Sequence, residues 1–166
     1  MKMLKPQTTE ITPSDVAKYF LYRSMQDGEL VSPLKMQKLV YYAYSWNLVK
    51  NGKKLFEESI EAWPNGPVVP SLYRQLKKYG SAPIGEDFLG ASTQEEVDSF
   101  MGKFRGKVGV TLDMVYQEYM TKTAFELVMS THSEKPWIEA RKGLSATERS
   151  NNPITDEMIV QQYGQA

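Results

Sequence analysis

The pattern of apolar positions predicts a largely helical chain with one helix at its centre. Between residues 33 and 50, apolar side chains occupy two adjoining faces of a helix, and only a narrow strip is at all polar. The strip consists of Lys35, Lys38, Tyr42, Ser45 and Val49. A helix that is apolar over most of its circumference packs inside a domain. We therefore expect the other elements to surround this one.

Capping signals predict where helices begin and end. Thr12 and Ser32 each precede a proline, so each can cap a helix whose first position suits that proline. Gly52 is placed to end the central helix. Either Thr121 or Thr123 can cap a later helix that ends near residue 131. Similar signals continue to the end of the chain, and the pattern gives about seven helices.

The segment after the central helix is the one candidate for β-structure. Residues 55–63 form a short, partly alternating segment, with Ile60 and Ala62 opposite Glu61 and Trp63, which predicts a brief strand or an extended segment. Pro64-Asn65-Gly66 is a turn signal. The sequence thus predicts a mainly α fold. We expect a single compact multi-helix domain at residues 12–166, with at most a small β element, behind a flexible tail at residues 1–11.

Composition narrows the classes of protein to consider. Twenty basic and twenty acidic residues give a formal net charge of zero, which argues against a dedicated nucleic-acid binder because such proteins need an excess of Lys and Arg. The chain has no cysteine, which excludes disulfides, thiolate metal sites and cysteine nucleophiles. No apolar run approaches the length of a membrane span or a signal peptide. We therefore expect a cytoplasmic protein with no membrane partner.

His132 is the only histidine, so any imidazole chemistry depends on it. It could pair with a neighbouring serine or, with Glu126 or Glu134, hold a metal ion. However, there is no GxSxG motif and no recognised ligand spacing. The favoured interpretation is that His132 fixes the end of a helix by bonding to nearby backbone. The phosphate-binding motifs GxxxxGK[ST] and GxGxxG are also missing. We therefore expect no cofactor, no metal and no enzymatic activity.

Two further patterns have a structural interpretation beside a functional one. Glu57, Glu58 and Glu61 could supply paired carboxylates for acid–base catalysis, but three acids in a polar segment are usually surface charge. The aromatic residues at positions 41, 42, 44 and 46 could stack nucleobases. Few basic residues accompany them, so core packing is favoured.

A loop rich in tryptophan, proline and tyrosine follows the candidate strand. Its residues are Trp63, Pro64, Pro67, Pro70 and Tyr73. A loop fixed by prolines loses little conformational entropy on binding, and aromatic side chains are favoured interface anchors. A tryptophan buried under its own loop is just as common. The sequence therefore leaves both interpretations open.

Three segments carry a specific resemblance to a known family. They read SPLKMQKLVYYAYSW from Ser32, GKKLFEESIEAWPNGPVVPSLYRQLKKYG from Gly52 and THSEKPWIEAR from Thr131. In this order and spacing they resemble the Panacea antitoxin domain, which includes SocA-like and phage-associated GepA-like proteins, and the likeness runs from about Thr12 to Tyr163. One departure is Tyr44-Ser45 before the tryptophan of the aromatic helix, where the family often has Gln-Gly.

The resemblance implies a mostly helical antitoxin of a toxin–antitoxin pair. Its partner would be a cognate protein toxin, neutralised by direct stoichiometric binding. The SocA branch implies an alternative, in which the protein is an adaptor that delivers the toxin to the ClpXP protease. The two differ in one observable, because an adaptor shortens the lifetime of the toxin whereas a neutraliser holds it in a stable complex.

We predict two clusters of partner-binding or fold-defining residues from these signatures. The first contains Trp63, Pro67, Val69, Pro70 and Tyr73, and the second contains His132, Pro136, Trp137 and Arg141. Arg141 is the residue best able to hold a carboxylate or backbone carbonyls. If the clusters meet, they form either a partner surface or a structural clasp, and complete burial of both tryptophans would favour the clasp.

Two other hypotheses remain at this point. An enzyme would use His132 with Glu61 or Glu134 in a pocket beneath the tryptophans. Alternatively, the acidic helix near residues 93–99 could contribute to the choice of partner, because its charge is one-sided.

Overall fold

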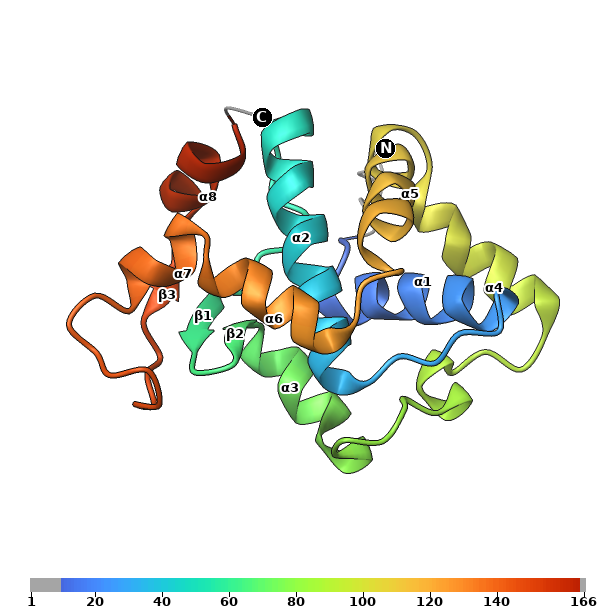
Figure 1. Ribbon diagram of the computed structural model, residues 1–166. Coiled ribbons are helices and arrows are strands. Elements are labelled where there is room, and N and C mark those ends of the chain that lie inside the picture. Colours follow the sequence, from blue (N-terminus) through green and yellow to red (C-terminus); the bar gives the residue numbers. More distant parts are fainter. Residues whose placement is uncertain (1–9, 165–166) are drawn as a thin grey trace, which may run out of the picture.

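The computed structural model describes residues 10–164, and this part of the chain is mainly α, as the sequence predicts. The tail predicted at residues 1–11 lies, up to residue 9, outside the described residues. It contains eight α-helices and a three-stranded sheet (Figure 1). The helices are α1 (Pro13–Gln26), α2 (Pro33–Asn51), α3 (Pro70–Leu76), α4 (Gln94–Met101), α5 (Lys107–Tyr119), α6 (Ala124–His132), α7 (Lys135–Ala140) and α8 (Asp156–Tyr163). The strands are β1 (Ile60–Trp63), β2 (Gly66–Val68) and β3 (Pro153–Ile154). Short 3-10 turns lie at Lys77–Tyr79, Glu86–Leu89 and Gly102–Phe104.

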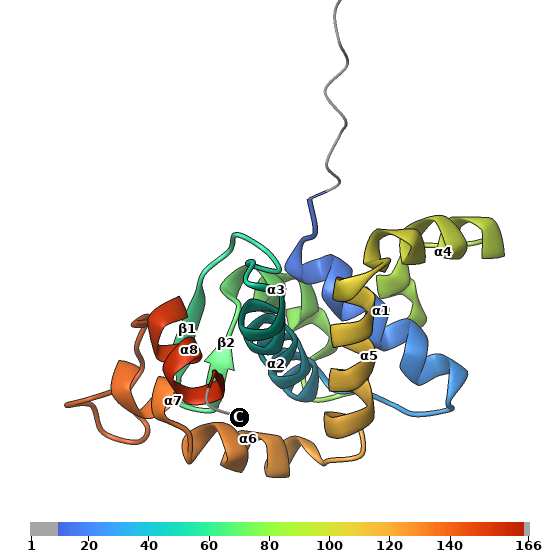
Figure 2. The same cartoon turned by 90° about the horizontal axis from the view of Figure 1, so that it is seen from above.

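The central position predicted for α2 is confirmed. Every residue from Met36 to Ser45 is buried, which requires neighbours on all sides of the helix. Seen from above, α2 has α1 and α5 on one side and β1 and α8 on the other (Figure 2). The helix thus forms the axis around which the rest of the chain is arranged.

The middle of the polar strip of α2, from Lys38 to Ser45, is buried, while Lys35 and Val49 at its ends are half-buried. Lys38 and Ser45 have no exposed surface, and Tyr42 is 1% exposed. Ser45 donates a hydrogen bond to the Tyr41 carbonyl oxygen at 2.9 Å. The Tyr42 hydroxyl donates to a carboxylate oxygen of Glu134 at 2.6 Å. Buried polar groups need such partners because they have left water, so the middle of this strip is part of the core.

The predicted helix caps are present, with one choice now resolved. Thr12 and Asp15 form a capping box at α1, each side chain bonded to the backbone N–H of the other at 3.1 Å. Thr123, not Thr121, caps α6, and it also forms a capping box. Gly52 ends α2 with a φ of 67°, a left-handed conformation that glycine adopts without strain.

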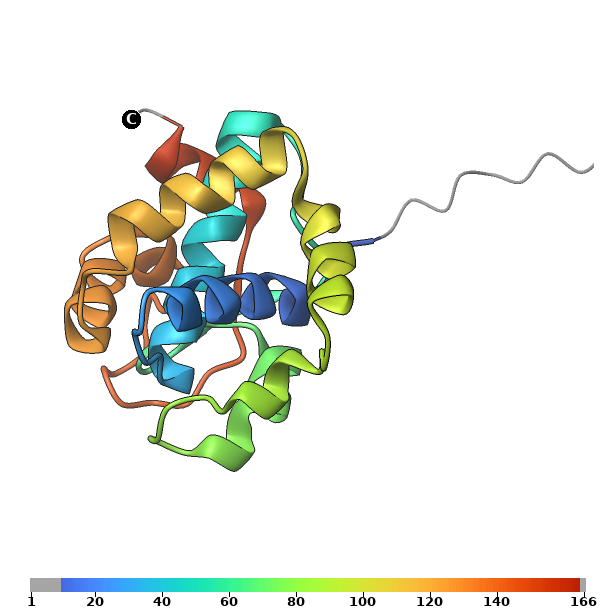
Figure 3. The ribbon, with the colours of Figure 1, turned by 90° about the vertical axis from the view of Figure 1, so that its right-hand side faces the viewer.

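The helix at residues 94–101 uses part of its acidic charge for its own structure. Glu96 accepts a hydrogen bond from the Ser92 N–H at 2.6 Å, and Asp98 accepts one from the Gln94 side chain at 2.9 Å. The connection through this helix lies on the α1 side of the molecule, away from α7 and α8 (Figure 3). Glu95 is exposed there without such a role in the described chain.

The sheet has the strand order β2–β1–β3, and both pairings are antiparallel. β1 and β2 form a hairpin across the predicted Pro64–Gly66 turn, with Trp63 opposite Gly66 and Ala62 opposite Pro67. β3 was not predicted, because a two-residue strand carries no periodicity. Its pairing brings a distant part of the chain beside β1.

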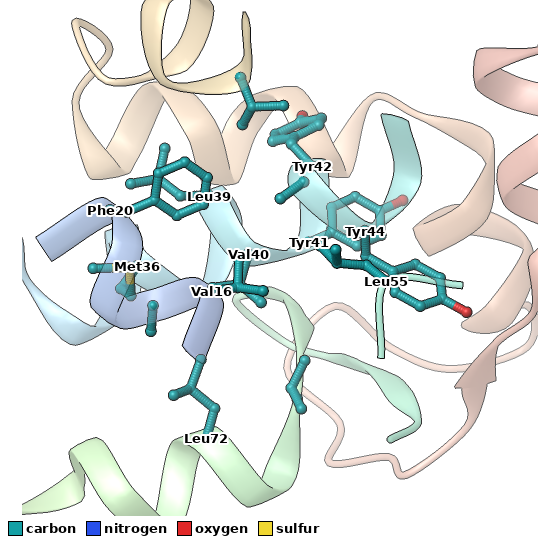
Figure 4. Packing of buried hydrophobic residues seen from close by; sticks show 14 of the residues in the cluster. Val16, Phe20, Met36, Leu39, Val40, Tyr41, Tyr42, Tyr44, Leu55 and Leu72 are labelled. Carbon is teal, nitrogen blue, oxygen red and sulfur yellow. The ribbon is translucent and has the colours of Figure 1, made fainter. Parts of the chain in front are cut away.

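The core fills the space between α2 and its neighbours. Val16 and Phe20 of α1, Met36 and Leu39 of α2 and Leu72 of α3 are completely buried and lie close together (Figure 4). Between α2 and α5, the rings of Tyr42 and Tyr119 stack nearly parallel, with their centroids 4.1 Å apart. None of the described helices is long and apolar enough to cross a membrane.

Leu39 provides a direct measure of how much the core depends on α2. Its side chain is completely buried, so Leu39→Ala should reduce the free energy of unfolding by about 2–5 kcal/mol through lost burial and the resulting cavity. The matched control is Leu30→Ala, because Leu30 is 75% exposed and its loss should change stability by less than about 0.5 kcal/mol. Chemical denaturation of both variants measures the difference, and equal effects would contradict the central role of α2.

Candidate functional site

The two clusters of signature residues meet at the hairpin formed by β1 and β2. The Trp137 indole N–H donates a hydrogen bond to the Trp63 carbonyl oxygen at 2.7 Å. One step along β1, Arg141 Nη1 donates to the Ala62 carbonyl oxygen at 2.9 Å. These bonds join residues that are 74 and 79 positions apart in the sequence. Both tryptophans remain partly exposed, so the complete burial that would favour a purely structural clasp is not observed.

Arg141 connects the hairpin to the loop that follows α7. Its guanidinium is buried and donates from Nη2 to the carbonyl oxygens of Ser145 at 2.8 Å and Glu148 at 2.7 Å. With the bond to Ala62, all its hydrogen-bond partners among the described residues are backbone carbonyls. The planar guanidinium suits such multiple bonding, which a lysine ammonium could not reproduce at these three positions. Arg141 therefore fixes where the loop at residues 142–152 stands relative to β1.

His132 lies flat against the Trp137 ring. The ring centroids are 3.9 Å apart and the planes differ by 14°. Burial lowers the pKa of His132, and the nearby cations Lys38 and Arg141 act in the same direction, while a backbone hydrogen bond with Pro64 opposes them. Pro64 belongs to the hairpin turn, so this interaction differs from the predicted bonding of His132 to the end of its own helix. Its Nε2 is buried and has no hydrogen-bond partner among the described residues.

The carboxylates considered for catalysis are directed elsewhere. Glu134 accepts a hydrogen bond from Tyr42, and Glu61 accepts one from the Trp63 indole at 2.9 Å. Glu57 and Glu58 line a separate cleft of about 380 Å³ beside the start of α8. Across residues 10–164, no three side chains of types that bind metals are grouped around one point.

Lys38 lies directly beneath the hairpin turn, a position that was not predicted from its place in the sequence. It is completely buried, and its ammonium group donates a hydrogen bond to the Pro67 carbonyl oxygen at 3.0 Å. Burial lowers the pKa of Lys38 to about 7. A Cβ atom at Gly66 would come within 2.7 Å of Lys38 Cε, so only glycine allows the turn to approach this closely. A lysine within a helical pattern gives no signal of such burial, because lysines usually lie at the surface.

Gln37 holds the chain immediately after β2. Its side-chain oxygen accepts a hydrogen bond from the Val69 N–H at 2.9 Å, and its amide nitrogen donates to the Val69 carbonyl oxygen at 3.3 Å. The side-chain amide of Gln37 thus bonds to both backbone groups of Val69. Gln37 and its neighbour Lys38 on α2 therefore supply hydrogen-bond partners for the backbone of residues 66–70.

An open groove of about 910 Å³ lies on the outer side of this arrangement. Its walls are the start of α2, the hairpin, α3 and the end of the loop that Arg141 fixes. The apolar residues lining it include Pro33, Leu34, Trp63, Pro64, Val68, Tyr73 and Leu76. Leu34 and Tyr73 are 38% and 41% exposed, which is high for large apolar side chains. The groove therefore presents apolar surface to solvent.

The groove separates most of the predicted residues into two groups, while Pro70, His132 and Trp137 are half-buried and do not line it. Trp63 and Tyr73 line it, with their rings 4.9 Å apart in an edge-to-face arrangement. Pro67, Val69, Pro136 and Arg141 are buried behind it, where they shape the hairpin and its supports. The other lining residues, Leu34, Lys77 and Arg149 among them, were not predicted as site residues, because sequence gives no signal for residues brought together from separate elements.

The buried amine of Lys38 should make stability depend on pH. In the folded chain its pKa is about 7, against 10.5 ordinarily. Between these values the unfolded chain holds the additional proton, so stability rises with pH. We expect the free energy of unfolding to increase by up to about 1.4 kcal/mol per pH unit between about pH 7.5 and 9.5. Lys38→Met should remove this slope.

The control for this titration is Lys50→Met, because Lys50 is exposed near the end of α2. Burial raises the pKa of Tyr41 and Tyr42, so their opposite contribution begins above the chosen pH range. Denaturation curves at several pH values give the slopes. Parallel slopes for Lys38→Met and the unchanged protein would show that Lys38 is not titrating in this window.

Comparison with known proteins agrees with the resemblance found in the sequence. The family model described as "Antitoxin SocA-like, Panacea domain" matches residues 36–138. A curated relative, Antitoxin SocA of Caulobacter vibrioides (strain NA1000 / CB15N), is 46% identical over 50 residues, which is 30% of this chain. The aligned region spans 27% of that relative's own length. No solved structure matches the chain. Because the family model covers more than half of the sequence, including the hairpin and the Trp63–Trp137 contact, the chain belongs to the SocA-like family of Panacea-domain antitoxins.

Proposed function

We propose that this protein is an antitoxin that neutralises a cognate protein toxin by binding it directly. Membership of an antitoxin family supports the role, and the matching relative is itself named an antitoxin. The observation that carries the binding mechanism is the open apolar groove, where Trp63 and Tyr73 are grouped with Leu34. Aromatic side chains held on a rigid frame lose little entropy on binding, which makes them suitable interface anchors.

The proposal assigns different roles to the signature residues. Trp63 and Tyr73 would contact the toxin from the groove. Trp137 and Arg141 would act behind them, since their hydrogen bonds hold the backbone of β1 and fix one wall of the groove. This division explains why a chain with a binding function carries a set of buried prolines and a buried arginine around two partly exposed aromatics.

The experiment that tests the proposal is co-expression with the adjacent open reading frame. If that frame encodes the toxin, its expression alone should arrest growth, co-expression should restore growth, and the two proteins should co-purify. If the product of the adjacent frame is harmless and does not bind, the hypothesis that this protein belongs to a toxin–antitoxin pair is rejected. The same cells distinguish the adaptor alternative, because rescue with a shortened toxin lifetime indicates delivery to a protease such as ClpXP.

Tyr73→Ala and Trp63→Ala should weaken toxin binding by at least about tenfold each, since anchor residues commonly contribute more than about 1 kcal/mol. Growth rescue should fall accordingly, and the affinity of the purified pair measures the effect. Both variants should remain folded because they remove side chains that are partly exposed.

The matched control for these variants is Phe125→Ala. Phe125 is an aromatic residue on α6 with 72% of its surface exposed, and it does not line the groove. We expect its loss to leave binding and rescue unchanged. If Phe125→Ala abolishes rescue while Tyr73→Ala does not, the toxin binds at α6 and the groove is not the interface.

A further inference from the structure

The edge of the sheet next to the groove is closed to an added strand. β2 is an edge strand, and edge strands commonly bind partners through free backbone groups. The Ala62 N–H donates to Asn152 on the β3 side at 2.9 Å, so Pro67, which pairs with Ala62, directs its backbone to the outer edge. Proline has no N–H to donate, and its carbonyl oxygen already accepts from Lys38.

The residue after β2 is equally unavailable. Gln37 occupies both the N–H and the carbonyl oxygen of Val69. A partner strand would have to displace these buried bonds, which costs free energy because each group would then need a new partner. A partner at this surface must therefore insert side chains into the groove instead of extending the sheet.

The apolar part of the groove sets the first requirement on those side chains. Leu34 comes from α2, Trp63 and Val68 from the hairpin, and Tyr73 and Leu76 from α3. Its volume of about 910 Å³ is near the upper end of the ~300–1,000 Å³ typical of ligand pockets. The groove therefore has room for more than one aliphatic or aromatic side chain.

Charge at the groove sets the second requirement. Lys77 and Arg149 are exposed and line the groove from two separate segments: Lys77 follows the last residue of α3, and Arg149 belongs to the loop fixed by Arg141. Neither forms an ion pair within the described chain. Glu61 is the one acidic residue of the lining, and its carboxylate already accepts the indole N–H of Trp63. The groove thus has an excess of positive charge around an apolar floor.

We propose that this groove binds a short apolar segment of the toxin flanked by Asp or Glu, through inserted side chains and not by strand addition. This inference rests on the proposed antitoxin function and adds the chemistry of the bound segment. Carboxylates of the segment pair with Lys77 and Arg149, while its apolar side chains cover Leu34 and Tyr73. The chemistry of the groove does not depend on the fold of the toxin that carries the segment.

The test uses a phage-displayed library of random peptides, panned against the immobilised full-length protein. Enriched peptides should combine aliphatic or aromatic residues with nearby Asp or Glu. A synthetic copy of one such peptide should bind more weakly as ionic strength rises, because exposed ion pairs are screened by salt. Absence of enrichment, or enrichment of basic peptides, would overturn the proposal.

Matched variants locate the binding site. Tyr73→Ala should lower the affinity for the enriched peptide at least tenfold. Tyr73→Phe keeps the ring, so its affinity should stay within about threefold of that of the unchanged protein. Lys77→Glu combined with Arg149→Glu should also weaken it at least tenfold, and panning on this double variant should no longer enrich acidic peptides. Lys107→Glu, an exposed charge reversal at the start of α5, should have little effect. Peptide binding that survives both groove variants would place the site elsewhere and overturn the proposal.

Comparison with the growth assay separates this inference from the proposed function. Toxin rescue that is unaffected by the groove variants leaves the antitoxin role in place and rejects the groove as its interface. The opposite outcome is also distinguishable. If acidic peptides bind in the groove but the neighbouring gene product is harmless and does not bind, the groove has the proposed ligand specificity, and the segment it binds does not come from that gene product.

Discussion

The structure depends on supplying hydrogen-bond partners to a β-hairpin packed against the helices of the domain. A buried backbone group without a partner costs about 1–3 kcal/mol, and the segment from Ala62 to Val69 has several that no strand satisfies. Four side chains from two helices and their ends supply these partners: Gln37, Lys38, Trp137 and Arg141. Since each side chain belongs to an element of the helical core, the hairpin is held at a fixed place relative to α2 and α7.

This arrangement accounts for the position of the groove. Arg141 and Trp137 approach β1 from one side, and Arg141 carries the loop at residues 142–152 with it. Lys38 and Gln37 approach the other end of the hairpin from α2. The tryptophan and tyrosine between these supports are left half covered, so their apolar faces are available to a partner. The buried polar contacts and the exposed aromatic side chains thus both belong to the β1–β2 hairpin and the residues that hold it.

Much of this could be expected from the sequence, and the exceptions have a common cause. The apolar pattern of α2 and the caps of α1 and α6 depend on residues within a few positions of each other, so they were predictable. The signature residues were identified, but their division into groove residues such as Tyr73 and supports such as Arg141 was not. Lys38 carried no sign of its burial, since the group that accepts its hydrogen bond lies 29 residues away.

By itself, the sequence determined the fold class, the central helix, the turn at Pro64–Gly66 and the family. These follow from local periodicity, turn chemistry and motifs read in order along the chain. Only the tertiary structure decided which residues share a surface: the pairing of β3 with β1, the burial of Lys38 and the joining of Leu34, Tyr73, Lys77 and Arg149 around one groove. The physical reason is that burial and charge at a site are set by neighbours from distant segments, and these become neighbours only when the core around α2 has packed.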